Sequence, residues 1–322
     1  MHLRHCAGCG FPCLERFVER HATLDDVVKM HGQVIVSKVA AIVKTRADGT
    51  EKLRIIIDML RSSVNSFVRI EERIILPRLA DMIADLIALA GALESGTDQY
   101  IDMTVLDFSD AFHTIGVAPG ELRFQVFRLP DGGYGVYRTA VFGGGGSPLT
   151  WGRAAAFFGR SGQSLFPLDA VRIEIYVDDP WTAFRGTHGE IRRNKVILML
   201  WWIVVGPELS WAKIAHGQSL KWIGAQVTIV SSYEFMISLP DDYAPELATE
   251  ALRLLGVSAP PLQDVRKLTG RCSWAAGFVP ALGAMIAPLW AAIADCMAGG
   301  AEQPQRTAPR LVPIIRIRLD LL

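Results

Sequence analysis

Two adjacent carboxylates, Asp178 and Asp179, follow an alternating segment of the sequence and lead directly into Pro180. In residues 171–177 apolar and polar side chains alternate with a period of two, which predicts a half-buried β-strand that ends in a turn. Like charges side by side are unfavourable unless a cation neutralises them, and Mg²⁺ prefers oxygen ligands of this kind. Taken alone, an Asp-Asp-Pro sequence has a second interpretation, an ordinary solvated turn.

A third carboxylate, Asp107, lies near the end of another apolar run, residues 103–108. Two strands that each deliver a carboxylate to one place can hold two metal ions about 3.5–4 Å apart, as phosphoryl-type displacements require. Between the two runs lies the segment FGGGGSP, residues 142–148, whose glycines allow the backbone to approach a substrate closely. It lacks the lysine of a P-loop and the spacing of a dinucleotide fingerprint, so a plain flexible loop is its alternative interpretation.

The elements that must position these residues are of mixed type. Asp48-Gly49 predicts a hairpin between residues 40–44 and 52–58, and a second hairpin is predicted within residues 123–141. Helical patterns cover residues 81–93, 151–158, 195–205, 240–256, 263–276 and 284–297. The sequence therefore predicts an α+β fold that becomes nearly all helical after residue 235.

Two apolar runs need separate interpretation. Residues 196–205 are too few to span a membrane and predict a buried helix. Residues 274–293 are long enough, but their glycines and prolines favour packed helices. We expect no membrane partner, with a membrane-associated protein as the alternative.

Composition narrows the class of protein. The 322 residues include 33 basic and 33 acidic side chains, so the net charge is zero and nucleic-acid binding would depend on local basic clusters. Five cysteines without paired spacing, and charges throughout residues 1–20, favour an intracellular protein of the cytoplasm or nucleus rather than a secreted one. Cys6, Cys9 and Cys13 have a spacing that can bind zinc, and a structureless N-terminus is the alternative.

In order along the chain, these segments resemble the motifs of reverse transcriptases from retroelements, nearest to DIRS-like and gypsy-like elements. The matching motifs are D-x-x-D-A-F at 107–112, F-G-x-x-x-S-P at 142–148, Y-x-D-D at 176–179, Lys213, and W-I-G at 222–224. The resemblance covers roughly residues 38–295. It implies a right-hand polymerase fold: an N-terminal remnant (1–35), fingers and an antiparallel palm sheet (36–235), a helical thumb (236–298) and a tail (299–322).

The resemblance also implies roles for individual residues. Those that would bind two Mg²⁺ ions, or Mn²⁺, are Asp107, Asp178 and Asp179, and Lys213 completes the catalytic set by neutralising or protonating pyrophosphate. Those that would contact the incoming nucleotide are Arg54, Phe112, Phe142 and Gly143. Those that would form the primer grip are Trp222, Ile223 and Gly224. A core tryptophan, a solvated lysine and a strand-lining arginine are the alternatives for Trp222, Lys213 and Arg54.

The implied activity is that of an RNA-directed DNA polymerase of a retrotransposon. Its partners would be an RNA or DNA template with a primer strand, deoxynucleoside triphosphates (dNTPs), and ribonuclease H, integrase or recombinase domains of a longer polyprotein. Two departures stand out, Leu60 where an arginine is expected and four consecutive glycines at 143–146. They motivate an alternative, a catalytically decayed remnant that only binds nucleic acid.

Overall fold

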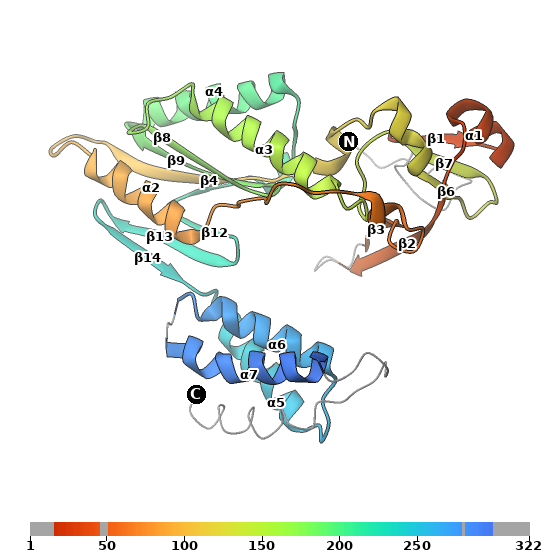
Figure 1. Cartoon of the computed structure of the whole chain (residues 1–322). Coiled ribbons are helices and arrows are strands. Elements are labelled where there is room, and N and C mark those ends of the chain that lie inside the picture. The colour runs from red at the N-terminus through yellow and green to blue at the C-terminus, as the bar shows by residue number, and fades with distance from the viewer. Residues whose placement is uncertain (1–15, 46–50, 279–280, 299–322) are drawn as a thin grey trace. The chain divides into compact units, whose positions relative to one another are not determined.

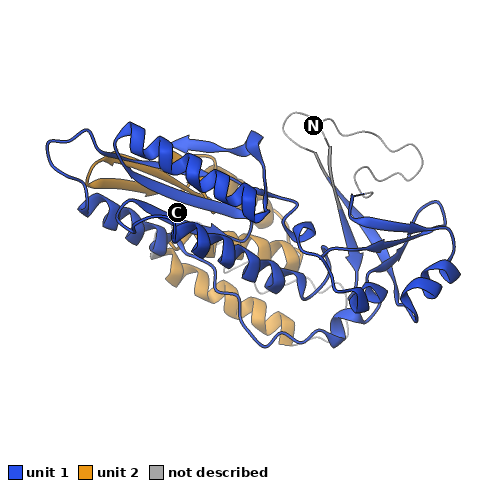
Figure 2. Cartoon of the chain, turned by 90° about the horizontal axis from the view of Figure 1, so that it is seen from above, with its two compact units in different colours: residues 1–218 blue, residues 219–322 orange. Residues whose placement is uncertain are grey.

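The computed structural model describes residues 16–45, 51–278 and 281–298 (Figure 1). The predicted zinc ligands Cys6, Cys9 and Cys13 and the predicted tail 299–322 lie outside the described residues. The chain forms two compact units, residues 1–218 and 219–322 (Figure 2). The predicted division of fingers and palm from thumb after residue 235 concerns functional subdomains and stays a prediction.

An antiparallel four-stranded sheet in the first unit has the strand order β11-β4-β9-β8. Its strands are β4 (Tyr100–Val105), β8 (Val171–Tyr176), β9 (Asp179–Gly186) and β11 (Ala215–Gly217). Two residues separate β8 from β9, and Tyr176 pairs with Asp179, so these strands form a tight hairpin. The alternating segment of residues 171–177 thus forms the strand that its pattern predicts.

Helices cover both faces of this sheet (Figure 1). The helices are α2 (Leu79–Gly91), α3 (Ser147–Gln163) and α4 (His188–Val205). Apolar residues of β8 pack with Trp151 and Phe158 of α3 and Trp202 of α4 in one core cluster. Arg172 of β8, on the other side of the strand, pairs with Asp85 of α2 at 3.2 Å (Nη1 to Oδ1). The period of two in β8 therefore divides an apolar core from a charged contact.

A five-stranded sheet, in the order β1-β7-β6-β2-β3, makes up the other part of the first unit. Its strands are β1 (Val18–His21), β2 (Val36–Thr45), β3 (Glu51–Asp58), β6 (Val126–Arg128) and β7 (Tyr134–Tyr137). Both predicted hairpins are present, as β2 pairs antiparallel with β3, and β6 with β7. The remaining regular elements of this unit are short: α1 (Leu24–His31), β5 (Phe108–Ser109), β10 (Glu208–Leu209), and the 3₁₀ helices η2 (Val64–Phe67), η3 (Ala111–Thr114), η4 (Pro119–Phe124) and η5 (Trp211–Lys213).

The second unit joins a small antiparallel sheet to three helices. The strands are β12 (Ser219–Trp222), β13 (Ala225–Ser231) and β14 (Glu234–Ser238), and the helices are α5 (Tyr243–Leu255), α6 (Leu262–Ala275) and α7 (Ala281–Ala298). Leu254, Val265, Leu268 and Ile293 are buried together between the helices. The three helices predicted after residue 240 are therefore confirmed, with small shifts of their ends.

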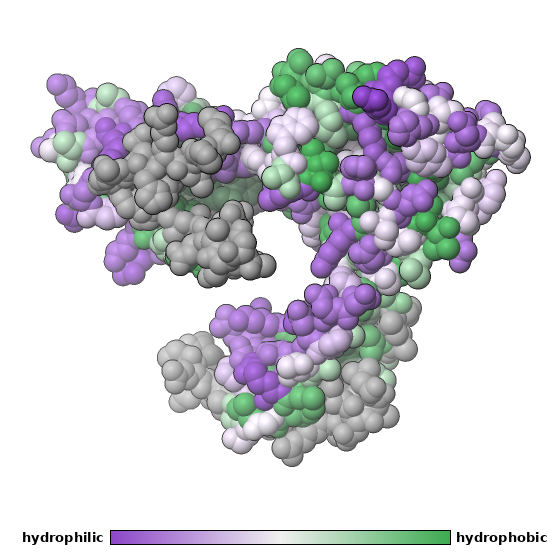
Figure 3. Space-filling view, turned by 180° about the vertical axis from the view of Figure 1, so that it is seen from behind, coloured by the Kyte–Doolittle hydropathy of each residue, from purple (hydrophilic) through white to green (hydrophobic). Residues whose placement is uncertain are grey.

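One prediction about burial is wrong. The apolar run 196–205 lies in α4, but Val196, Leu200, Ile203 and Val204 are exposed. Figure 3 shows hydrophobic side chains gathered along the upper edge of the molecule, where α4 lies. An apolar composition does not show which faces of a helix are buried. Here one face of α4 packs on the sheet, and the opposite face is exposed. None of the helices in the described part of the chain combines the length and hydropathy that a membrane span requires.

Candidate active site

The carboxylates Asp178 and Asp179 lie where β8 turns into β9. Val177, the first residue of the turn, has a φ of +57°, which is unfavourable for a β-branched side chain. Its carbonyl oxygen accepts a hydrogen bond of 2.8 Å from the indole Nε1 of Trp151, a buried residue of α3. The anchored tryptophan thus helps to hold the turn in an otherwise costly conformation.

Asp107 is brought to this turn by backbone hydrogen bonds on either side of it. The Phe108 amide donates to the Asp178 carbonyl oxygen at 2.8 Å, and the Leu106 amide donates to the Pro180 carbonyl oxygen at 3.2 Å. These bonds continue the pairing of β4 with β9 beyond the last residue of β4. Segments far apart in the sequence, each carrying a predicted metal ligand, therefore meet at one end of the strands of this sheet.

Two side chains from the segment after β10 engage Asp107. Lys213 Nζ lies 2.6 Å from Asp107 Oδ2, and the Ser210 hydroxyl donates to the same oxygen at 2.8 Å. The Ser210 amide also donates to the Asp107 carbonyl oxygen at 2.9 Å. The Lys213 side chain is 55% exposed and that of Asp107 is 20% exposed, so the pair opens toward solvent. Sequence reasoning identified Lys213 but missed Ser210, whose only signal is its position three residues earlier.

The negative charges gathered here affect the titration of Asp179. The pKa of Asp179 is raised to about 6, chiefly by burial and then by the charges of Asp178 and Asp107, while Lys213 opposes the rise. A bound divalent cation would reverse this balance and keep the carboxylates ionised at neutral pH. Carboxylate oxygens are the hard ligands that Mg²⁺ and Mn²⁺ accept. The donor set therefore fits the predicted metal ions.

Phe112 and Phe142, both predicted to contact a nucleotide, lie against each other. Their ring centroids are 4.9 Å apart, with the planes tilted by 53°. Phe112 belongs to η3, which follows Asp107 and β5, and Phe142 opens the glycine-rich segment. The His113 ring lies 6.0 Å from Phe142, edge to face. The structure thus joins the first two motifs through an aromatic contact.

The glycine-rich segment is held by β3 and by Asn65. The Ile57 amide donates to the Phe142 carbonyl oxygen at 2.9 Å. Gly143 has a φ of +104°, and a Cβ there would lie 1.9 Å from the Ile57 carbonyl oxygen, so only glycine fits. The Asn65 side chain donates to the Gly143 carbonyl oxygen at 2.9 Å and accepts from the Gly145 amide at 2.8 Å. The segment is therefore a clamped loop, and Asn65 is a positioning residue that the predicted site had not included.

A cavity of about 790 Å³ adjoins this loop. Gly144, Gly145, Gly146, Met59 and Asn65 are among the residues that line it. Arg54 lies on β3, where its backbone is in register with Ile42 of β2. Leu60, the departure from the expected arginine, is 75% exposed.

The residues predicted to grip a primer lie where β12 turns into β13 in the second unit, at a hairpin turn of two residues. Trp222 pairs with Ala225, and Ile223 and Gly224 between them have φ values of +40° and +86°. Positive φ at both positions is typical of the turns that join tight hairpins. The Trp222 side chain is only 2% exposed, so it packs as a core tryptophan. A grip at this position would therefore act through the turn and its backbone, not through the indole.

Comparisons with known proteins give a structural match and no sequence match. No protein-family model matches the chain, and no curated protein matches it significantly. Foamy viral protease-reverse transcriptase is similar in structure: bound to double-stranded DNA in a form designated dRH (TM-score 0.59, 15% identity), to an RNA/DNA hybrid (0.57, 14%) and to double-stranded DNA (0.57, 15%).

Each of these matches covers 95% of this chain, which spans 45%, 34% and 53% of the respective viral chains. Similarity at this level of identity establishes the arrangement of the backbone. The chain therefore has the polymerase fold of reverse transcriptases.

Proposed function

We propose that the chain is the polymerase region of a retroelement reverse transcriptase, of the DIRS-like or gypsy-like kind, which extends a primer with dNTPs on an RNA template. The observation that carries the proposal is the meeting of Asp107, Asp178 and Asp179 at the β8–β9 turn, with Lys213 beside them. The order of the motifs supports it. So does the fold, since the similar viral enzymes were solved with double-stranded DNA or an RNA/DNA hybrid.

The chain's own residues have distinct tasks in this proposal. The three aspartates would hold two Mg²⁺ ions, which when bound supply Lewis-acid activation of the primer 3′-hydroxyl and neutralise the triphosphate. Lys213, whose half-exposed side chain pairs with Asp107, would neutralise or protonate the departing pyrophosphate. Ser210 holds the Asp107 carboxylate through its hydroxyl and the Asp107 backbone carbonyl oxygen through its amide.

Nucleotide selection falls to the aromatic pair and the glycine loop. Phe112 would close the space beside a ribose 2′-hydroxyl, the group that distinguishes the two sugars. Phe142 supports Phe112 from the adjoining segment. The cavity beside the loop that Asn65 clamps would receive a template nucleotide, and Arg54 would meet the triphosphate with its guanidinium.

Primer extension by the purified chain, with RNA and DNA templates compared side by side, tests this function. We expect Mg²⁺-dependent extension of a DNA primer on RNA, which Asp178→Asn abolishes while the circular dichroism spectrum stays unchanged. Undiminished extension by that variant would contradict the proposed two-metal mechanism.

A second candidate is a catalytically silent remnant that binds nucleic acid. The exposed Leu60, where the resemblance calls for arginine, and the net charge of zero favour it. Filter binding at several salt concentrations separates the two candidates. Salt-dependent binding of a primer–template duplex without any extension supports the remnant, and extension excludes it.

A further inference from the structure

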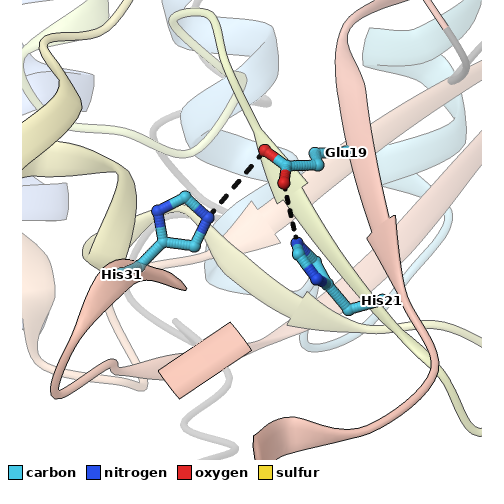
Figure 4. Close-up of side chains that lie close together, drawn as sticks. All are labelled: Glu19, His21 and His31. Atoms are coloured by element: carbon cyan, nitrogen blue, oxygen red, sulfur yellow. Dashed lines mark ion pairs between the residues drawn. The ribbon is translucent and has the colours of Figure 1, made fainter. Parts of the chain in front are cut away.

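Three side chains that commonly bind metals converge outside the candidate active site, in the five-stranded sheet region. Glu19 and His21 lie on β1, and His31 is the last residue of α1 (Figure 4). One ligand atom from each lies within 4.8 Å of the others. Neither the resemblance nor the proposed function uses these residues.

Their geometry is close to that of one coordinated ion. His21 Nε2 lies 3.2 Å from Glu19 Oε1, and His31 Nε2 lies 3.9 Å from Glu19 Oε2. Ligands around a tetrahedral zinc ion, at bond lengths of about 2.0–2.1 Å, are separated by about 3.3 Å. Since the ligand atoms lie within 4.8 Å of one another, a single ion requires them to approach by at most about 1.5 Å, within the reach of side-chain rotation.

Burial gives a second, independent indication. The side chains of His21 and His31 are only 7% and 8% exposed. The Nε2 atom of each is buried and, in the described part of the chain, makes no hydrogen bond of normal geometry, although the Glu19 carboxylate lies 3.2 Å from one and 3.9 Å from the other. Buried polar atoms in native proteins almost always have a partner, and both of these face the Glu19 carboxylate (Figure 4). An ion bound between them would satisfy both nitrogens at once.

Helix α1 packs on the sheet through few buried residues, so a metal ion that links it to β1 would stabilise it. Helix α1 has eight residues, of which Val27 alone is fully buried. The core cluster beneath it contains just Val27, Val126 and Val136 as buried residues. His31 also lies in the last turn of α1, where the helix dipole favours positive charge. A metal ion shared with β1 would fasten this weakly packed helix to the edge of the sheet.

We propose that Glu19, His21 and His31 bind one Zn²⁺ ion that stabilises the α1–β1 region. Two neutral imidazoles and a carboxylate form a ligand set that suits Zn²⁺, whereas Mg²⁺ prefers oxygen ligands throughout. The 30% exposure of Glu19 leaves a side from which water completes the coordination.

Metal binding by the full-length chain tests the proposal. After removal of metal with a chelator, we expect one equivalent of Zn²⁺ per chain and a zinc-dependent rise in Tm, because the ion binds the folded state. Substitution with Co²⁺ should give the visible spectrum of a nitrogen and oxygen site, without a thiolate charge-transfer band. No uptake by the unaltered chain, or uptake with a thiolate band only, would overturn the proposal.

Variants locate the ion. Glu19→Gln, which preserves shape and is the least disruptive change, and His31→Ala should each weaken Zn²⁺ binding at least tenfold, since even partners that merely orient a ligand contribute about 10–100-fold. The exposed histidine variant His188→Ala serves as the matched control and should bind normally. Combined replacement of Cys6, Cys9 and Cys13 by serine should also leave affinity unchanged. Loss of binding in that variant, with normal binding by Glu19→Gln, would place the ion at the cysteines and refute the proposal.

Discussion

Carboxylates occur in two contrasting situations along strand β8, one just beyond its C-terminal end and one in its middle. Beyond its end, Asp178 and Asp179 meet Asp107 and the exposed Lys213. In its middle, Glu174 meets Asp85 of α2, with Arg172 as the counter-charge. The pKa of Glu174 is raised to about 7, first by burial and then by the charge of Asp85, a perturbation comparable to that of Asp179, whose pKa is raised to about 6.

The difference teaches that a perturbed pKa does not by itself mark an active site. Both clusters face the same repulsion among buried carboxylates. Between the sheet and α2, a proton retained on Glu174 and the positive charge of Arg172 reduce the repulsion, and neither requires a ligand. At the open turn the relief depends on an exposed lysine and, in the proposed function, on metal ions. Replacing one carboxylate by its amide in each cluster, Asp178→Asn and Glu174→Gln, tests whether the two clusters differ in function.

The largest effect is expected from Asp178→Asn at the open end. The amide removes a metal ligand, so primer extension should fall at least about 10³-fold, equivalent to about 4 kcal/mol of transition-state stabilisation. Stability should be retained or raised, because a like charge has been removed. Single-turnover extension and thermal melting measure the two quantities. Normal extension would remove the distinction between the clusters.

Lys213→Met should lower extension about 10²-fold, or about 2.7 kcal/mol. The variant loses the cation beside Asp107, and the pKa of Asp179 should rise further, because Lys213 is the group that opposes the rise. The optimum of extension should therefore move to higher pH, as the carboxylates ionise later. A pH–rate profile with an unchanged acidic limb would show that Lys213 is only a solvated lysine.

Glu174→Gln should remove a pH-dependent contribution of about 3 kcal/mol to stability and leave extension within about twofold of the parent chain. Because the folded pKa of Glu174, about 7, lies above the unfolded value of 4.5, the folded state binds more protons between these pH values. Stability of the parent chain should thus fall as pH rises from about 4.5 to 7. The glutamine variant should lack that fall, which urea unfolding at several pH values measures.

The smallest effect is expected from Ser210→Ala. It removes the hydroxyl that donates to Asp107 Oδ2, while Lys213 and the backbone amide of residue 210 still hold the aspartate. A loss of about 1 kcal/mol is expected, seen as a roughly fivefold slower extension at low Mg²⁺. A Mg²⁺ titration should recover part of the rate. Ser109→Ala, which alters only the hydroxyl contact with Ser210, is the matched control.

Sequence reasoning located strands and hairpins well where a pattern is local. The alternation in residues 171–177 predicted β8, and Asp48-Gly49 predicted the β2–β3 hairpin. The order of the motifs predicts that Asp107, Asp178 and Asp179 share one site, and the segments that carry them meet in the structure. Each of these signals lies within a short segment or in the order of segments.

Contacts between distant segments carried no such signal. Asn65 holds the glycine loop, and Trp151 holds the Val177 carbonyl, yet no local pattern marks either side chain as a clamp. The same limit applies to the burial of α4 and to Trp222. An apolar residue type predicts that burial of the side chain is favourable, but tertiary packing decides whether the side chain is buried.

The exposed apolar side chains of α4 bear on the colloidal behaviour of the protein. Val204 is 78% exposed, and Val196, Leu200 and Ile203 extend the same apolar surface. The chain has no net charge at pH 7, so long-range repulsion between molecules is weakest there while short-range apolar attraction persists. Neutral pH is therefore the condition in which these helices most favour self-association, and a shift of pH in either direction should disperse the molecules.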